Sequence, residues 1–199
     1  VGDDVVVADR LVVAAGAWAP TVLGDALPLQ PVRRAVAFFE VADGARCTPA
    51  RMPVYVWALD DGDAIYGFPE TSPGRGIKVG FHYRGPDVDP DVIDRAATDA
   101  EIADLREVAS ECFAGVTGTC VDSSVCMYTM TPDEHFVVGM APGSGDRVVV
   151  AAGFSGHGYK FAPAIGEALA ELATSGAASQ PIGFLSPQRF SDRPGRRRS

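Results

Sequence analysis

The segment Cys126–Gly139 places a thiol, two carboxylates and an imidazole within fourteen residues, ahead of an apolar run. Cysteine can act as a nucleophile, and histidine beside acids can bind a metal or move protons. One histidine next to two adjacent acids cannot complete a metal site alone, so we interpret Asp133-Glu134-His135 as a turn and expect no metal. Cys126 has apolar neighbours, which is typical of a small core residue, and composition does not mark it as reactive.

A glycine-rich turn, Gly153–Lys160, joins the apolar run Val148–Ala152 to a predicted helix. Gly153, Gly156 and Gly158 allow a ligand to approach the backbone closely. Backbone N–H groups and the positive end of a helix dipole suit an anion or the electron-rich carbonyl edge of a reduced flavin. The dinucleotide fingerprint G-x-G-x-x-G occurs nowhere in the sequence. A plain tight turn that needs glycine is the alternative interpretation.

The same turn carries further polar side chains. The hydrolase elbow G-x-S-x-G would need glycine where His157 stands, and Ser155 and His157 are poorly spaced for a nucleophile and its base. A serine hydrolase is therefore a weak alternative. Lys160 lies in the first helical turn, where a cation opposes the helix dipole. A bound carboxylate would account for it, and a solvated surface lysine is the other interpretation.

Lys78 and His82 are four residues apart on the predicted strand Ile77–Tyr83, so their side chains share one face. Gly76 and Gly80 leave room for a flat ligand over that face. Without further information, the water-exposed face of an antiparallel sheet explains the same pattern.

Buried strands and short helices must position the glycine turn. The apolar runs Leu11–Ala15 and Val148–Ala152 suit a parallel sheet covered on both faces. A helix is predicted to start at Ala19-Pro20, and the last helix to start near Pro163 and end before Gly176.

A mostly antiparallel sheet with flanking helices must carry Lys78 and His82. A hairpin is expected around Asp60-Asp-Gly-Asp63. The capping box Thr98–Glu101 starts a helix. We predict Gly115–Ser124 to be a loop. The further predicted strands are Arg34–Val41, Val54–Leu59, Ala64–Phe68, Val125–Tyr128 and Phe136–Met140. The fold class is therefore α/β (α+β).

The bulk composition excludes some classes of function. The chain has 199 residues, 47% hydrophobic residues and a formal charge of −9, so it can bury a core and is a poor match for nucleic acid. The basic stretch Arg193–Ser199 is interpreted as a solvated terminus, with a nucleic-acid arm as the alternative. Four cysteines without a Cys-x-x-Cys pair indicate reduced thiols and a cytoplasmic protein. No membrane span or leader is expected, because no apolar run reaches about 18 residues.

Several separated segments together resemble the monomeric sarcosine oxidase and N-methyl-tryptophan oxidase family, in the same order and at similar spacing. They are Val12–Trp18, Tyr66–Pro69 with Ile77–His82, Cys126–Thr129 with Pro132–Phe136, and Ala151–Phe161. Leu27–Pro31 ahead of Phe38-Phe39 also looks like the family's entry into its substrate domain.

The resemblance implies a role for each matching residue. Cys126 matches the covalent attachment site of FAD, and Lys78 the lysine that activates dioxygen. His82 matches an active-site histidine, and Tyr66 and Tyr128 match tyrosines of the substrate pocket. On the glycine turn, Lys160 matches the lysine that pairs with the substrate carboxylate, and His157 a histidine near the flavin. The remaining residues implied to bind the cofactor are Gly16, Gly153, Phe154, Gly156 and Gly158.

The resemblance also implies an activity and a domain division. The activity is FAD-dependent oxidation of the C–N bond of a secondary amino acid, with dioxygen reduced to hydrogen peroxide, in a monomer. Residues 1–27 and about 141–185 would be the remnant of a Rossmann-like FAD-binding domain, 28–140 the substrate domain and 186–199 a tail. The family's N-terminal fingerprint is missing, so we expect a C-terminal fragment that is inactive alone. A flavin dehydrogenase that does not use oxygen and a non-catalytic module for small carboxylates are the alternatives.

Overall fold

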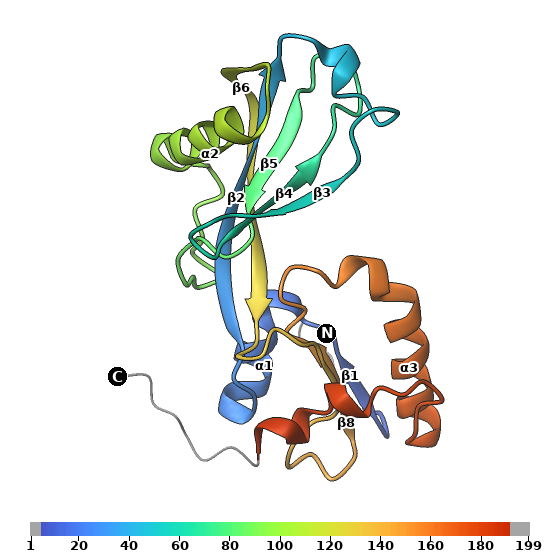
Figure 1. Ribbon diagram of the computed structural model, residues 1–199. Coiled ribbons are helices and arrows are strands. Elements are labelled where there is room, and N and C mark those ends of the chain that lie inside the picture. The colour runs from blue at the N-terminus through green and yellow to red at the C-terminus, as the bar shows by residue number, and fades with distance from the viewer. Residues whose placement is uncertain (1–4, 192–199) are drawn as a thin grey trace. The chain divides into compact units, whose positions relative to one another are not determined.

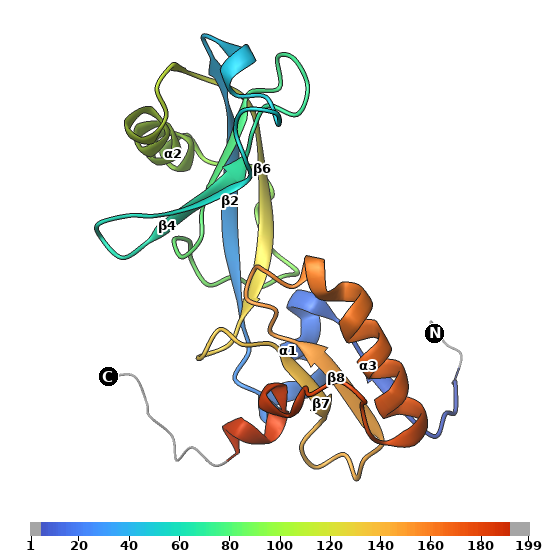
Figure 2. The same cartoon turned by 45° about the vertical axis from the view of Figure 1, so that its right-hand side comes forward.

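The computed structural model of the chain describes residues 5–191 (Figures 1 and 2). The basic stretch Arg193–Ser199 lies outside these residues. The chain divides into two compact units, one made of the residues up to Pro31 and from Tyr128 onward, the other of Val32–Met127. We call them the three-stranded unit and the five-stranded unit after their sheets. Within residues 5–191, no helix is both long and apolar enough to cross a bilayer.

The three-stranded unit is built on the apolar runs identified in the sequence. Its sheet has the order β1 (Leu11–Val13), β8 (Val148–Ala152) and β7 (Val137–Met140). Strand β1 pairs with β8 in parallel and β7 pairs with β8 antiparallel, which confirms both predicted strands. Strand β8 is buried as predicted, but β1 lies at the edge of the sheet with Leu11 and Val12 exposed, so the prediction of burial is wrong for β1.

Both faces of strand β8 are covered, as its continuous apolar sequence requires. Val149 and Ala151 pack in a cluster with α3 (Ala162–Ser175). Val150 and Ala152 pack in a cluster that contains Ala19 of α1 (Ala19–Leu23). Figure 2 shows α3 alongside β7 and β8. Helix α3 ends at Gly176 in the left-handed conformation with φ 83°, as predicted.

The five-stranded unit has the order β3 (Tyr55–Ala58), β4 (Ala64–Phe68), β5 (Ile77–Phe81), β2 (Gln30–Val41) and β6 (Val116–Met130). Strand β4 is antiparallel to both β3 and β5, and β5 is antiparallel to β2. The predicted hairpin around residues 60–63 and the mostly antiparallel sheet are therefore confirmed.

Helix α2 (Asp99–Cys112) covers one face of this sheet (Figure 1). It starts at the predicted capping box, in which Thr98 Oγ1 accepts from the Glu101 N–H and the Glu101 carboxylate accepts from the Thr98 N–H. Leu105 and Val108 of α2 bury their side chains against the sheet. The sheet residues of this core include Ala37, Phe39, Ile65, Ile77, Val79 and Phe81.

Strand β6 corrects the prediction of a loop at Gly115–Ser124, because β6 begins at Val116. The segment contains Gly115, Gly118 and Asp122, and glycine and aspartate are depleted in strands, so its composition predicts a loop. It is nevertheless an edge strand beside β2, with Thr117 Oγ1 donating to the Glu40 carboxylate at 2.9 Å. Gly118, with φ 81°, interrupts its regular backbone.

The division into domains at 28–140 stays a prediction. The later boundary between the two compact units falls at Met127–Tyr128, and β7 pairs with β8 of the three-stranded unit. Residues 186–191 of the predicted tail form ordered structure, in which Pro187 is fully buried. The short 3₁₀ helices are Gly16–Trp18, Gly24–Ala26, Gly44–Arg46, Tyr159–Phe161, Gly183–Leu185 and Pro187–Phe190.

Candidate functional site

Lys78 of β5 lies between two aromatic rings on the sheet face opposite α2. Its Nζ is 4.9 Å from the Phe68 ring centroid and 5.5 Å from that of Tyr66. The cross-strand pairing of Phe68 with Lys78 brings these side chains together. Burial lowers the pKa of the Lys78 ammonium, and the Cys126 thiolate opposes this shift. The result is a partly buried cation fixed over aromatic faces.

His82 follows the same strand, two residues beyond Gly80. Its ring makes an edge contact with the Tyr66 ring at a centroid distance of 6.3 Å. A side chain at Gly80 would run into both Val36 and Tyr66, so glycine there allows the rings to pack. The structure therefore brings together Lys78, His82 and Tyr66, three of the residues singled out in the sequence.

Cys126 of β6 is a partly buried free thiol in the same five-stranded unit. Burial raises the pKa of this thiol, and the positive charges of Lys78, Arg34 and Arg95 partly offset the increase. Cations near a cysteine favour the thiolate, which is the nucleophilic form. Cys126 is thus distinguished from an ordinary core cysteine by the cations around it.

The glycine turn in the three-stranded unit has a conformation that its residue types require. Gly153 and Gly156 have φ values of 62° and 81°, in the left-handed region. A Cβ at Gly156 would overlap the ring of Tyr128, and one at Gly153 would overlap Thr131. These two glycines are therefore explained by the packing of the chain itself.

Three further residues of the predicted cofactor site are Phe154 and Gly158, which lie in this turn, and Gly16, which follows β1. Gly158 has an ordinary φ, but a Cβ there would overlap the Phe154 ring. Gly16 has φ 56° and no heavy atom within 4 Å of the position of an added Cβ. Gly16 is thus required by backbone conformation while the space above it stays open.

The contacts of Ser155 and His157 do not form the nucleophile–base pair of a hydrolase. The Ser155 hydroxyl donates to the Gly153 carbonyl at 3.1 Å, whereas His157 Nδ1 lies 3.1 Å from the Ser155 carbonyl oxygen. Ser155 is also only 1% exposed, so its hydroxyl is closed to a substrate. The exposed Lys160 ammonium donates to the His157 carbonyl at 3.2 Å.

A cleft of about 410 Å³ in the three-stranded unit has His157 and Lys160 in its lining. The other lining residues are mainly apolar and include Phe136, Phe161, Ile182 and Phe184. The Phe136 ring packs against the His157 ring at a centroid distance of 4.8 Å. The cleft therefore combines apolar walls with one cation, Lys160, and two imidazoles, those of His135 and His157.

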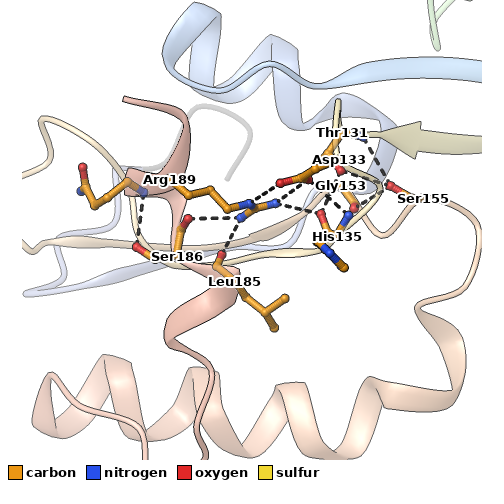
Figure 3. A network of polar contacts seen from close by, with 9 residues as sticks. Thr131, Asp133, His135, Gly153, Ser155, Leu185, Ser186 and Arg189 are labelled. Carbon is orange, nitrogen blue, oxygen red and sulfur yellow. Dashed lines mark hydrogen bonds and ion pairs between the residues drawn. The ribbon is translucent and has the colours of Figure 1, made fainter. Parts of the chain in front are cut away.

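A polar network joins the turn after β6 to the C-terminal segment (Figure 3). Arg189 forms an ion pair with Asp133 and donates to the carbonyls of His135, Leu185 and Ser186. Residues 5–191, this network included, contain no cluster of three His, Cys, Asp or Glu side chains able to hold a metal ion.

Comparisons with known proteins show the family of this chain. The sequence profile of the FAD dependent oxidoreductase (DAO) family matches residues 1–172. The chain belongs to this family of FAD-dependent oxidoreductases. It is 40% identical over 190 residues to a monomeric sarcosine oxidase of Streptomyces avermitilis, which covers 94% of this chain and 50% of that protein. The resemblance seen in the sequence is thus confirmed.

Other members of the family are also similar. An N-methyl-L-tryptophan oxidase of Salmonella typhi is 33% identical, over 92% of this chain and 48% of that protein. The solved structure of NikD, described as an unusual amino acid oxidase essential for nikkomycin biosynthesis, superposes with a TM-score of 0.69 at 23% identity. It covers 89% of this chain and 48% of that chain, and shows the shared fold. The chain spans about half the length of the curated relatives it matches.

Two features of this FAD-dependent oxidoreductase went unrecognised in the sequence. Arg34 is 3% exposed and donates from Nε to the His82 carbonyl at 3.0 Å. Its signal was the pair of adjacent arginines, Arg33 and Arg34, inside the largely apolar strand β2. Arg189 and Asp133 form the second feature, and no local pattern joins residues 56 positions apart.

Proposed function

We propose that this chain is the catalytic part of an FAD-dependent amine oxidase. It would oxidise the C–N bond of a secondary amino acid and reduce dioxygen to hydrogen peroxide. The observation that carries the proposal is the Lys78 ammonium held against the Phe68 and Tyr66 rings, with its charge acting on the Cys126 thiol. The three-stranded unit would be part of the FAD-binding domain, and the five-stranded unit the substrate domain.

The residues present fit FAD. Cys126 is partly exposed and lies among cations that favour its thiolate, which suits a thiol that would be attached to the flavin 8α position. Gly16 leaves open space over a backbone that only glycine adopts easily. Cys126 would hold the cofactor covalently, while Gly16 and the turn from Gly153 to Gly158 would contact it. When bound, FAD supplies the acceptor for the two electrons of the amine.

The substrate would be held by polar and aromatic side chains. Lys160 is an exposed cation at an apolar cleft, which suits the carboxylate of an amino acid. Tyr66 and Tyr128 would provide aromatic walls, and His82 and His157 would contact the reacting region. These residues bind and orient the substrate, which is how a protein favours hydride transfer without itself carrying the electrons.

Lys78 would act on dioxygen by its charge. An electron arriving on dioxygen creates an anion, and a fixed cation stabilises that anion more strongly when water is excluded. The partial burial of Lys78 among aromatic rings provides such a place. This role favours an oxidase over a flavin dehydrogenase.

A non-catalytic module for small carboxylates is the second candidate. The cleft with Lys160 and His157 in its lining supports it, because it offers apolar walls and a cation without any need for Cys126 or Lys78. In that case, substitution of Lys160 would weaken carboxylate binding, while substitution of Cys126 or Lys78 would change nothing.

The test is a fusion of the first half of the Streptomyces avermitilis sarcosine oxidase to this chain. Mass spectrometry under denaturing conditions should show covalently added FAD, and N-methyl amino acids should produce hydrogen peroxide. A Cys126→Ser fusion should lose the added mass and still fold. A folded fusion that binds FAD, yet is reduced by no N-methyl amino acid, would overturn the proposal. The chain alone should keep its bare mass.

A further inference from the structure

The Asp133–Arg189 pair lies at the centre of a network in the three-stranded unit (Figure 3). Arg189 Nε donates to Asp133 Oδ2 at 2.8 Å and Nη2 donates to Oδ1 at 3.1 Å. The two side chains are 18% and 19% exposed. Such a bidentate pair combines charge with a defined geometry, so it fixes orientation as well as position.

Arg189 also donates hydrogen bonds to backbone carbonyls in the segment that contains Asp133 and in its own segment. Its Nη2 donates to the His135 carbonyl at 2.9 Å, and Nη1 donates to the Leu185 and Ser186 carbonyls at 2.9 and 3.1 Å. One guanidinium therefore joins the segment Thr131–His135 to the segment Leu185–Arg189.

The segment Thr131–His135 is hydrogen-bonded to the glycine turn through Ser155. Thr131 Oγ1 donates to the His135 carbonyl at 2.8 Å, and the Thr131 N–H donates to Ser155 Oγ at 3.3 Å. Ser155 Oγ then donates to the Gly153 carbonyl at 3.1 Å. Figure 3 shows this continuous path from Arg189 to Gly153.

Ser155 needs such support because its backbone is strained. Its φ is 47°, a left-handed conformation that costs a non-glycine residue roughly 1–2 kcal/mol. A residue in such a conformation persists only when its surroundings hold it there. Here the Ser155 N–H donates to the Thr129 carbonyl at 3.0 Å, and the side chain is held by Thr131 and Gly153.

We propose that Arg189 is a positioning residue for the turn Gly153–Gly158, so that the C-terminal segment supports the cofactor site. Naming the turn as part of a cofactor site rests on the proposed function, whereas the link from Arg189 to the turn does not. Arg189 touches neither substrate nor cofactor in this account and acts through Asp133, Thr131 and Ser155.

Apolar packing already holds the C-terminal segment against the three-stranded unit. Arg189 is therefore not needed to keep this segment in place, and its role is the polar link to residues 131–135. Leu185 is 5% exposed in the cluster under α3, and Pro187 is buried against Gly139, where a Cβ would lie 2.8 Å from its Cδ. These contacts remain when Arg189 is replaced. What is lost is the polar link to residues 131–135.

The test is amide hydrogen exchange on the 199-residue chain carrying Arg189→Gln, Arg189→Lys or Asp133→Asn. We expect exchange at residues 153–158 to rise about tenfold in Arg189→Gln and Asp133→Asn, since a charge-assisted bidentate pair is lost. The double variant should be no worse than either single variant, and Arg189→Lys should be intermediate. Residues 77–81 of the five-stranded unit should not change.

Arg10→Gln is the matched control. Arg10 also donates hydrogen bonds to backbone carbonyls of the three-stranded unit, those of Leu172 and Ala173. These bonds are not part of the path that links Arg189 to the glycine turn. Its loss should loosen the end of α3 and leave residues 153–158 protected. The inference is wrong if Arg189→Gln affects only residues 183–190, or if it raises exchange equally across β7, β8 and α3.

A second readout separates this inference from the proposed function. In the fusion carrying Cys126→Ser, FAD is held without a covalent bond, and Arg189→Gln should increase its dissociation rate several-fold. Faster exchange at residues 153–158 with unchanged FAD dissociation would keep the link but remove the turn from the cofactor site. Unchanged exchange would overturn the link itself.

Discussion

Lys78 and Cys126, on strands β5 and β6 of one sheet, act on each other electrostatically. The Lys78 charge favours the thiolate of Cys126, and that thiolate favours the charged form of Lys78. Burial works against both charges, because it raises the pKa of the thiol and lowers that of the ammonium. Each group therefore keeps the other closer to its reactive, charged form.

Replacing Lys78 with Met should slow alkylation of Cys126 by iodoacetamide. Loss of the cation raises the pKa of the thiol further, so less thiolate is present at pH 8. We expect the rate of alkylation to fall by about threefold to tenfold, measured by peptide mass mapping, because the pKa of the thiol rises. Arg34→Gln should act in the same direction with a smaller effect.

Cys112 is the internal control for that experiment. Burial and the Glu111 charge raise the pKa of its thiol, and Lys78 is not among the causes. Its alkylation rate should therefore stay the same in Lys78→Met. Equal slowing at both cysteines would point to a change in folding instead of a local charge.

Stability of the three-stranded unit should depend on pH through Asp133. Hydrogen bonds and charge from Arg189 hold the pKa of this carboxyl at about 2, below its ordinary value. Because the folded pKa is depressed, the stabilisation is present above about pH 4 and is lost as pH falls toward 2. Asp133→Asn should therefore cost about 2 kcal/mol at pH 7.

Urea unfolding at pH 7 and near pH 2 measures this contribution. The wild-type chain and Asp133→Asn should differ at pH 7, and most of the difference should be lost near pH 2, where about half of the wild-type carboxyl is protonated and neutral. A difference that stays constant across this range would show that the aspartate acts through shape and not through its charge.

Gly156→Ala should destabilise the glycine turn. The new Cβ would overlap the Tyr128 ring, and φ at this position is 81°, so both sterics and backbone oppose the change. We expect a loss of at least about 1–3 kcal/mol in unfolding free energy. Gly166→Ala in α3 is the matched control, since no atom lies within 4 Å of its added Cβ. That variant should gain roughly 0.5–1 kcal/mol from helix propensity.

The elements that could be predicted from the sequence are those whose signals are local. The capping box at Thr98, the hairpin between β3 and β4, and the glycine after α3 each depend on residues a few positions apart. The shared face of Lys78 and Gly80 follows from strand geometry alone. Only the stretch Val125–Tyr128 of strand β6 was predicted, and the structure confirms it. The first half of β6 was predicted to be a loop, because its pairing with β2 overrides an unfavourable composition.

The candidate site could be predicted only where residue types carry a distinctive pattern. The spacing of Lys78 and His82 predicts that they share one face, whereas Tyr66 was singled out only by the resemblance to the family. The three residues lie together, since neighbouring strands place them on one face. Arg34 and the pair Asp133–Arg189 act through backbone carbonyls and contacts between distant segments. Such contacts leave no local spacing to recognise. The aromatic rings around Lys78 became apparent only through the register of β4 and β5.

Lys78→Met in the fusion protein should separate the two halves of the proposed reaction. Reoxidation of the reduced enzyme by dioxygen should fall by about a hundredfold or more, because a preorganised charge next to a forming anion is removed. Reduction by the amine substrate should fall much less, since Lys78 is assigned no contact with the substrate carboxylate. Stopped-flow absorbance of the flavin follows each half separately.

Lys160→Met provides the opposite pattern and serves as the control for Lys78→Met. Lys160 is assigned to the carboxylate, so its loss should raise the substrate concentration needed for half-maximal reduction and leave reoxidation unchanged. Equal losses in both half-reactions for Lys78→Met would contradict the role of its charge in oxygen activation. Normal reoxidation of that variant would instead favour an electron acceptor other than dioxygen, because the partly buried cation assigned to dioxygen would then be dispensable.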